Sequence, residues 1–317
     1  MFSIKVSSPF PARGTAPGGR TRWVSRQVGD RVIHVLLLSF AFTCIVFLVG
    51  IVIVLLMEGL PVLQKLGIAP FILGRDWYPT YEPPSFGALP LVLGSLWVTL
   101  GAIIVAVPLG IGAAIYTSQI AGERTREMIK PIVELLAGIP SVVYGFFGMA
   151  VVSPLVQRIF DLPTGLTALT GAITLAIMSL PTVVSISEDA ITAVPNSYKE
   201  ASYALGATKW ETISRVVVPA ASSGIFTAVI LGISRAIGET MTVLMVAGNS
   251  AIIPRSFLQP VRTMTATIAA EMGEAPVGSD HYHALFAIGI LLFLMTLIFN
   301  ILADFLTRRY KERMGKV

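Results

Sequence analysis

The sequence predicts an all-α integral membrane protein with six transmembrane helices. Hydrophobic residues account for 54% of its 317 residues, charged residues for only 13%, and the mean hydropathy is +0.78. A soluble domain carries about 25% charged residues. The apolar residues are also gathered into six nearly charge-free runs, and a helix of about 20 apolar residues crosses the hydrocarbon core of a bilayer. Together these observations exclude an ordinary soluble globular protein.

The six runs give the expected helices in order. The first covers residues 32–57. It is too long for the apolar core of a signal peptide, and no Ala-x-Ala cleavage site follows it, so we expect it to remain as a helix. The other five helices are expected at about residues 89–120, 132–156, 162–187, 219–247 and 284–306.

The positive charges predict the orientation in the membrane. Lys and Arg are concentrated in residues 1–31, in the loops after the second and fourth helices, and in residues 307–317. Because cytoplasmic segments carry the excess of Lys and Arg, we expect both termini in the cytoplasm. Residues 1–31 then form a flexible basic tail, residues 58–88 an external segment, and residues 307–317 a second basic tail. The net charge of +5 thus reflects membrane topology and lipid surroundings and does not indicate a nucleic-acid partner.

The sequence lacks the usual signatures of an enzyme. It contains no Gly-x-x-x-x-Gly-Lys-Ser/Thr motif, which is the loop that cradles nucleotide phosphates. No Ser-His-Asp or metal-ligand spacing rises above chance. We therefore expect no catalytic residue, metal site or cofactor in this chain. Asp280, His281 and His283 are close in sequence, and we interpret them as part of a solvated external loop rather than a metal site.

The fifth run carries two charged residues, Arg235 and Glu239. Each costs about 2.5 to 3.5 kcal/mol at a bilayer centre. At spacing i, i+4 they would share one helix face, and Thr242 would continue it. One interpretation is a buried ion pair that fixes helix register. The other is that Arg235 provides positive potential for a passing anion while Glu239 orients it and moderates the attraction.

Two further polar residues follow a proline in the third helix. Pro140 should bend this helix, and Ser141 and Tyr144 come directly after it. They either line a pathway or form interhelical hydrogen bonds. The candidate translocation-pathway residues are Arg235, Glu239, Thr242, Ser141 and Tyr144.

The loop at residues 194–219 is too structured for a simple connection. Ser197–Glu200 and Thr208–Glu211 each match a capping box, in which a Ser or Thr caps a helix start and a Glu reaches back to its amide. Gly206 lies between them, where a helix end favours positive φ. We expect two short helices at a sharp angle, with Pro219 beginning the fifth membrane helix. Several aromatic residues in the loop suggest that a partner docks there.

This loop resembles the EAA loop of ABC-importer permeases. The matching residues are Glu200, Ala201, Gly206 and the Val-x-Val-Pro stretch 216–219; valines replace the family's Ile and Leu. In that family the loop forms coupling helices that insert into a cleft of the ATPase subunit, which holds the nucleotide. The resemblance implies a coupling loop with these candidate residues: Ser197, Glu200, Ala201, Gly206, Thr208, Trp210 and Glu211.

Three other stretches narrow the resemblance. Residues 87–100, 133–148 and 235–249 look like the PstC-type permease of the phosphate ABC importer, in which the matching Arg and Glu are associated with transport. The resemblance implies a type I ABC-importer permease core at residues 89–306, in a bacterial cell inner membrane. The chain would form half of the translocation pathway of an ATP-driven phosphate importer. It would need no cofactor of its own, because ATP and Mg bind to the ATPase.

The resemblance also implies the other components. They are a PstA-type permease, a dimer of ATP-binding subunits at the coupling loop, and an extracytoplasmic phosphate-binding protein. The residues alone indicate that the transported substrate is an anion, and its identification as phosphate is implied only by the resemblance. The main alternative is a permease for another oxyanion, such as sulfate, molybdate or phosphonate. An ion-coupled secondary transporter would be expected to show repeated halves, which the sequence lacks, and a membrane scaffold would need neither the charged pair nor the loop.

Overall fold

The computed structural model describes residues 19–314, with only the backbone described for residues 19–30, 306 and 308–314. The outer parts of both expected tails lie outside the described residues. The inner part of each tail is helical: α1 begins at Gly19 and ends at Leu66, and α13 extends from Asp280 to Met314. The chain divides into two units, Met1–Val54 and Leu55–Val317, and α1 passes from the first into the second.

The prediction of six membrane helices is confirmed. Six described helical segments are long and apolar enough to cross a bilayer: Arg31–Leu66, Leu89–Ile120, Ser141–Ile159, Ala168–Thr192, Lys209–Gly238 and Asp280–Phe305. The fourth is shifted from the expected 162–187 because Thr167 caps it, its side chain accepting the Thr170 amide hydrogen at 3.3 Å.

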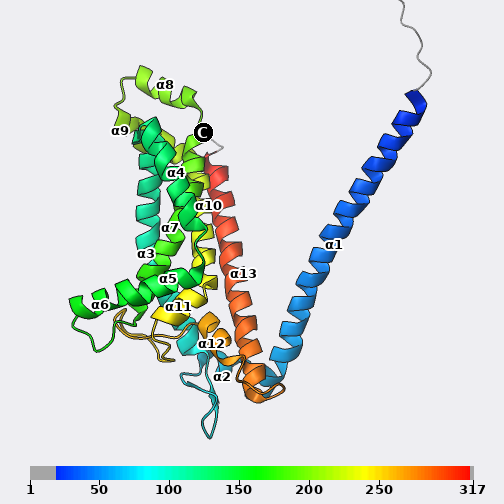
Figure 1. Ribbon diagram of the computed structural model, residues 1–317, viewed down its shortest axis with the longest axis vertical. Helices are drawn as coiled ribbons and strands as arrows, with labels where there is room; N and C mark the ends of the chain where they lie inside the picture. The colour runs from blue at the N-terminus through cyan, green and yellow to red at the C-terminus, as the bar shows by residue number, and fades with distance from the viewer. Residues whose placement is uncertain (1–18, 315–317) are drawn as a thin grey trace, which may run out of the picture. The chain divides into compact units, whose positions relative to one another are not determined.

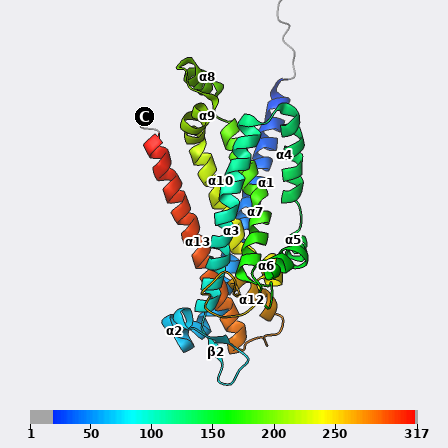
Figure 2. The same cartoon turned by 90° about the vertical axis from the view of Figure 1, so that its left-hand side faces the viewer.

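Three of these helices form the centre of the second unit. They are α3 (Leu89–Ile115), which continues into the π-helical turn η1 (Tyr116–Ile120), α7 (Ala168–Thr192) and α10 (Val218–Gly238). α7 packs along both of the others, and the three run side by side in Figures 1 and 2. Small residues bring the backbones close: a Cβ on Gly101 would lie 2.7 Å from the Ala172 methyl.

The third predicted helix is not one continuous helix in the structure. A single helix was expected at 132–156, but α4 (Glu123–Ala137) ends before Gly138, and a new helix begins at Ser141. This second segment comprises α5 (Ser141–Phe147), the π-helical turn η2 (Gly148–Val152) and α6 (Ser153–Ile159). Pro140 disfavours helix at the preceding residue and lacks an amide hydrogen. Figure 1 shows α4 along the bundle and α5 and α6 running across it.

The fifth predicted helix, 219–247, is interrupted as well. α10 ends at Gly238, and Glu239 is extended, with φ −71° and ψ 130°. A short helix, α11 (Met241–Val246), follows, and after an irregular segment comes α12 (Met264–Glu271). At its other end α10 continues without a break from α9 (Lys209–Thr212) and the π-helical turn η3 (Ile213–Val217).

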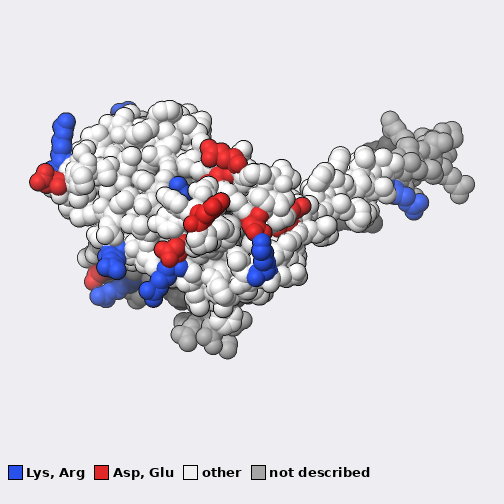
Figure 3. All heavy atoms as spheres, turned by 90° about the horizontal axis from the view of Figure 1, so that it is seen from below, with Lys and Arg blue, Asp and Glu red and all other residues white. Residues whose placement is uncertain are grey.

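The two ends of the second unit differ in structure. At one end lie α8 (Asn196–Ala204) and α9; at the other lie α2 (Ile68–Leu73), α12 and a hairpin (Figures 1 and 2). The hairpin pairs β1 (Trp77–Tyr78) with β2 (Ser85–Phe86) in antiparallel register. Figure 3, a view from below, shows charged side chains in separate groups on an otherwise uncharged surface.

The orientation can be tested with reporters. A reporter fused after Met314 should be active on the cytoplasmic side, and one inserted near Glu82, in the hairpin, should be accessible from outside. The excess of Lys and Arg on the α8 side is the physical reason. Measurement of reporter activity in intact cells checks this, and the reverse pattern would contradict the orientation.

Candidate functional site

The two interrupted helices meet. The Thr242 hydroxyl, at the start of α11, donates a hydrogen bond to the carbonyl oxygen of Ser141, at the start of α5, at 2.9 Å. Glu239 accepts the amide hydrogen of Thr242 at 3.1 Å through its carboxylate, and its carbonyl oxygen accepts the Thr265 hydroxyl at 2.8 Å. Backbone groups freed by a helix break need such partners, because lipid offers none. The structure therefore brings Ser141, Glu239 and Thr242 together, although not on one helix face.

Arg235 lies in the last turn of α10, beside this meeting point. Its guanidinium donates to the Thr182 hydroxyl of α7 at 3.1 Å. Among the residues whose side chains are described, 31–305 and 307, this is the one hydrogen bond that Arg235 makes to the protein from a group with five N–H donors. The side chain is half-buried, so the remaining donors are available to water or an anion.

The expectation that Arg235 and Glu239 share one helix face is wrong, and so is the first interpretation, a buried ion pair. The i, i+4 argument requires a continuous helix, and α10 ends at Gly238. No ion pair joins the two residues among the described part of the chain, whereas Glu239 instead caps α11. An ion pair that fixes helix register is therefore excluded, and the positive charge of Arg235 is not neutralised by this carboxylate.

Tyr144 spans the first break. Its hydroxyl donates to the carbonyl oxygen of Leu136 in the last turn of α4 at 2.7 Å, and its ring is buried. The side chain thus forms a hydrogen bond between helices, one of the two expected uses. Nearby, a Cβ on Gly145 would lie 2.6 Å from the Met245 sulfur, so a glycine is needed for α5 to approach α11 this closely.

The loop after α7 is partly as expected. Thr208 and Glu211 form a complete capping box at the start of α9, and Gly206 has φ +83°. The first expected box is wrong: α8 begins at Asn196 with Pro195 as its N-cap, and no side chain caps it. Pro at this point fixes φ near the helical value, so the helix starts before Ser197. The second short helix is also not separate, because α9 continues through η3 into α10.

The outer surface of this loop is exposed. Ser197, Glu200 and Ala201 lie on α8 with exposed side chains. The large apolar residues of the loop are exposed too, including a leucine that the sequence did not single out: Tyr198, Tyr203, Leu205 and Trp210. On the inner side, the Ser202 and Thr212 hydroxyls form a buried hydrogen bond at 2.9 Å between α8 and α9. The loop is therefore a rigid corner that presents apolar side chains.

A charged cluster at the opposite end was not predicted. Glu271 of α12 accepts hydrogen bonds from Trp77 at 3.1 Å and from His281 at 2.9 Å, and it pairs with Arg262. His283 donates to the Glu58 carbonyl oxygen at 2.8 Å. Interpreting the histidines as a solvated loop was therefore wrong. The Trp77–Glu271 and His283–Glu58 contacts join residues 194 and 225 positions apart, so no local pattern indicates these two contacts.

Comparison with known proteins agrees with this architecture. Residues 106–314 match the family model described as "Binding-protein-dependent transport system inner membrane component". The chain is 39% identical over 289 residues to "Probable ABC transporter permease protein YqgH" of Bacillus subtilis, covering 90% of this chain and 94% of that protein. It is 37% identical over 305 residues to "Phosphate transport system permease protein PstC" of Mesorhizobium japonicum, covering 90% and 92%.

Solved structures of transporters share the fold. A bacterial alginate ABC transporter, crystallised with a pentasaccharide-bound periplasmic protein, matches with a TM-score of 0.65 at 15% identity, covering 90% of this chain and 96% of that chain. The MetNI methionine ABC transporter, in an inward-facing conformation, matches with a TM-score of 0.53 at 17% identity, covering 71% and 94%.

The access of water to Arg235 can be measured by thiol labelling. In a Cys44→Ala background, which removes the single native cysteine, Arg235→Cys should react with a water-soluble methanethiosulfonate reagent about tenfold faster than Ala236→Cys, because only a hydrated thiolate reacts readily. Ala236 is the neighbouring residue and is buried. Equal labelling rates in membrane vesicles would show that the Arg235 side of α10 is dry.

Proposed function

This chain belongs to the family of binding-protein-dependent transport system inner membrane components, and we propose that phosphate is the substrate that it carries. As a permease subunit of an ABC importer in a bacterial inner membrane, it does not hydrolyse ATP itself. Relatives named phosphate transport system permease protein PstC, from Mesorhizobium japonicum and Xylella fastidiosa among others, support the choice of phosphate. They align with this chain over 90% and 98% of its length.

The observation that carries the proposal is the un-neutralised Arg235 beside two helix breaks. Arginine suits phosphate because its planar fork donates two parallel hydrogen bonds. Thr182 uses one donor of Arg235 and leaves the others. Glu239 caps α11 rather than pairing with Arg235. Its carboxylate lies four residues away in sequence and adds negative potential, which keeps anion binding weak enough for release.

The proposed importer contains three other kinds of subunit. A PstA-type permease forms the second half of the pathway. A dimer of ATP-binding subunits docks on α8 and its exposed apolar neighbours, Tyr198, Leu205 and Trp210. A phosphate-binding protein delivers phosphate at the end that carries α12 and the hairpin. ATP binding closes the ATPase dimer, α8 moves with it, and the two breaks shift relative to the second permease, so access alternates between the two sides.

Uptake of labelled phosphate tests the role of Arg235. Arg235→Gln should lower uptake at least about tenfold, because it removes the cation while keeping a hydrogen-bond donor for Thr182. Glu239→Gln is the matched variant: the amide oxygen still accepts the Thr242 amide hydrogen, so the cap of α11 should persist and uptake should fall less. Co-purification with the ATPase controls for assembly.

Two outcomes would contradict the proposal. Native uptake in Arg235→Gln would remove Arg235 from the pathway. If sulfate or molybdate competed with labelled phosphate as well as unlabelled phosphate does, the role of Arg235 in the pathway would stand, but the assignment of phosphate as the substrate would be rejected.

The coupling loop has a conformational test. Gly206 has φ +83°, and a Cβ at this position would meet no atom within 4 Å, so substitution is limited by backbone strain rather than by space. Gly206→Val should reduce phosphate-stimulated ATP hydrolysis about tenfold, because a β-branched residue resists positive φ. Gly206→Asn, which tolerates this conformation, should stay near the native rate. Equal rates for the two variants would contradict a requirement for this turn in coupling.

A further inference from the structure

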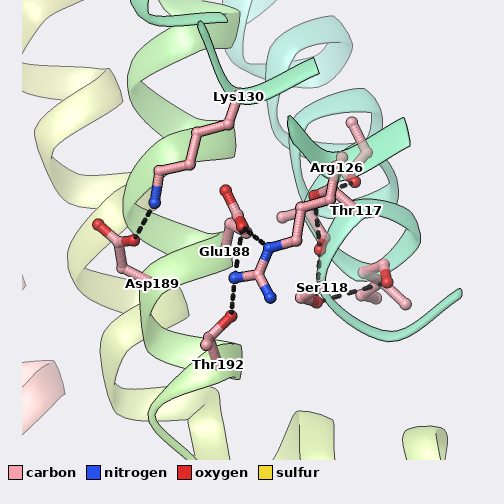
Figure 4. A network of polar contacts seen from close by, with 10 residues as sticks. Thr117, Ser118, Arg126, Lys130, Glu188, Asp189 and Thr192 are labelled. Atoms are coloured by element: carbon pink, nitrogen blue, oxygen red, sulfur yellow. Dashed lines mark hydrogen bonds and ion pairs between the residues drawn. The ribbon is translucent and has the colours of Figure 1, made fainter. Parts of the chain in front are cut away.

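α4 is joined to α7 by a set of charged contacts at the same end as α8. Arg126 of α4 donates through Nε to the Glu188 carboxylate of α7 at 3.0 Å, and its Nη2 forms an ion pair with the same oxygen at 2.9 Å. The Nη2 group also donates to the Thr192 hydroxyl at 3.1 Å. One helical turn further along α4, Lys130 pairs with Asp189 at 3.4 Å. Figure 4 shows both basic side chains reaching from α4 toward α7.

The Arg126–Glu188 pair holds this contact. The Glu188 side chain is only 5% exposed, and a buried carboxylate is strongly destabilising when its partner is removed. Lys130 and Asp189 are much more exposed, at 41% and 66%, so their pairing contributes little. α4 buries none of its own residues fully. Its alignment with α7 therefore depends on Arg126 more than on apolar packing.

The contact lies between the docking loop and the first helix break. At its cytoplasmic end α7 stops at Thr192, and α8 begins only four residues later, at Asn196. At the other end of α4, the Leu136 carbonyl oxygen accepts the Tyr144 hydroxyl, and Ser141 in turn accepts Thr242. The short chain connection from α8 to α7, followed by hydrogen bonds from α7 to α4 and from α4 to α5, thus links α8 to the meeting point of the two breaks.

We propose that Arg126 and Glu188 are a positioning pair that makes α4 move together with α7, so that displacement of α8 reaches the break before Ser141. The inference rests on the proposed transport function. α9, η3 and α10 connect the loop directly to Arg235, at the second break, and α4 provides the matching connection to the first. Both breaks then shift together relative to the second permease, as alternating access in the proposed importer requires.

The test uses the complete reconstituted importer in liposomes with phosphate-binding protein. Arg126→Gln should lower phosphate-stimulated ATP hydrolysis about tenfold, within the range by which residues in coupling elements change coupling. ATP hydrolysis without phosphate and co-purification with the ATPase should stay native. Arg126→Lys should recover part of the stimulation, because one ammonium can meet Glu188 but cannot also hold Thr192. Arg124→Gln is the control, since it removes the same charge from an exposed position on α4.

A second variant covers the case in which the buried carboxylate disrupts folding. Arg126→Ala with Glu188→Gln breaks the contact without leaving an unpaired charge. Native stimulation in this double variant would overturn the inference. So would a parallel loss of assembly and of basal hydrolysis in the double variant, because that is the signature of a purely structural contact.

Cross-linking tests the shared movement directly. The variant for this test combines Cys44→Ala, Lys130→Cys and Asp189→Cys. A short bifunctional thiol reagent should bridge α4 and α7 in this variant and leave phosphate transport intact. When Arg126→Gln is added, the same bridge should restore the phosphate-stimulated ATP hydrolysis. Loss of transport on bridging would overturn the inference, because it would mean that the helices separate in each cycle. If sulfate or molybdate, rather than phosphate, stimulated ATP hydrolysis by the native importer, the assignment of phosphate as substrate would fail. The Arg126 variants would then be compared with the native importer in the presence of that anion, and this comparison would still decide the role of Arg126.

Discussion

Backbone amides and carbonyls released by a helix break inside a membrane must be satisfied within the protein, because lipid offers no partner. In this chain two breaks, before Ser141 and after Gly238, satisfy this requirement largely through nearby side chains, and one further hydrogen bond joins the two breaks. The Thr242 hydroxyl binds the Ser141 carbonyl oxygen, and Glu239 caps the short helix that contains Thr242. Irregular backbone is tolerated at this depth where it is enclosed by protein or lines a wet cavity. The position of the proposed pathway thus follows from where unsatisfied backbone can be accommodated.

The charged residues follow the same constraint. Arg235 lies where the chain is already polar, with Thr182 as its partner, and Glu188 lies where Arg126 can reach it. Each charge is costly in an apolar environment, and each is placed beside a helix end or break. We propose that Arg235 contributes to substrate binding and that Glu188 contributes to the arrangement of helices. The two charges differ in burial, since Arg235 is half-buried and Glu188 is buried, and the partner of each charge indicates the purpose that we assign to it.

Sequence reasoning succeeded where the determining contacts are local. Charge-free runs gave the six helices, and the capping box at Thr208 and the turn at Gly206 depend on residues within four positions. Sequence reasoning failed where an apolar run was assumed to form one continuous helix. Hydropathy cannot distinguish a kink from a break, so Arg235 and Glu239 were placed on one face. At α8, Pro195 took the capping position expected for Ser197. The Arg126–Glu188 and Trp77–Glu271 contacts join residues separated by 62 and 194 positions, and no single-sequence pattern encodes such pairs.

The uninterrupted helix from Lys209 to Gly238 has a mechanical consequence. It joins the docking corner to Arg235 over 26 residue steps, or about 39 Å at 1.5 Å per residue. A rod of this length that pivots near its midpoint turns a tilt of about 5° into a shift of about 2 Å at either end, in opposite directions. A shift of that size exceeds the tolerance of a hydrogen bond. A small rotation imposed in the cytoplasm is thus enough to make or break contacts of a single guanidinium deep in the membrane, without any refolding of the helix.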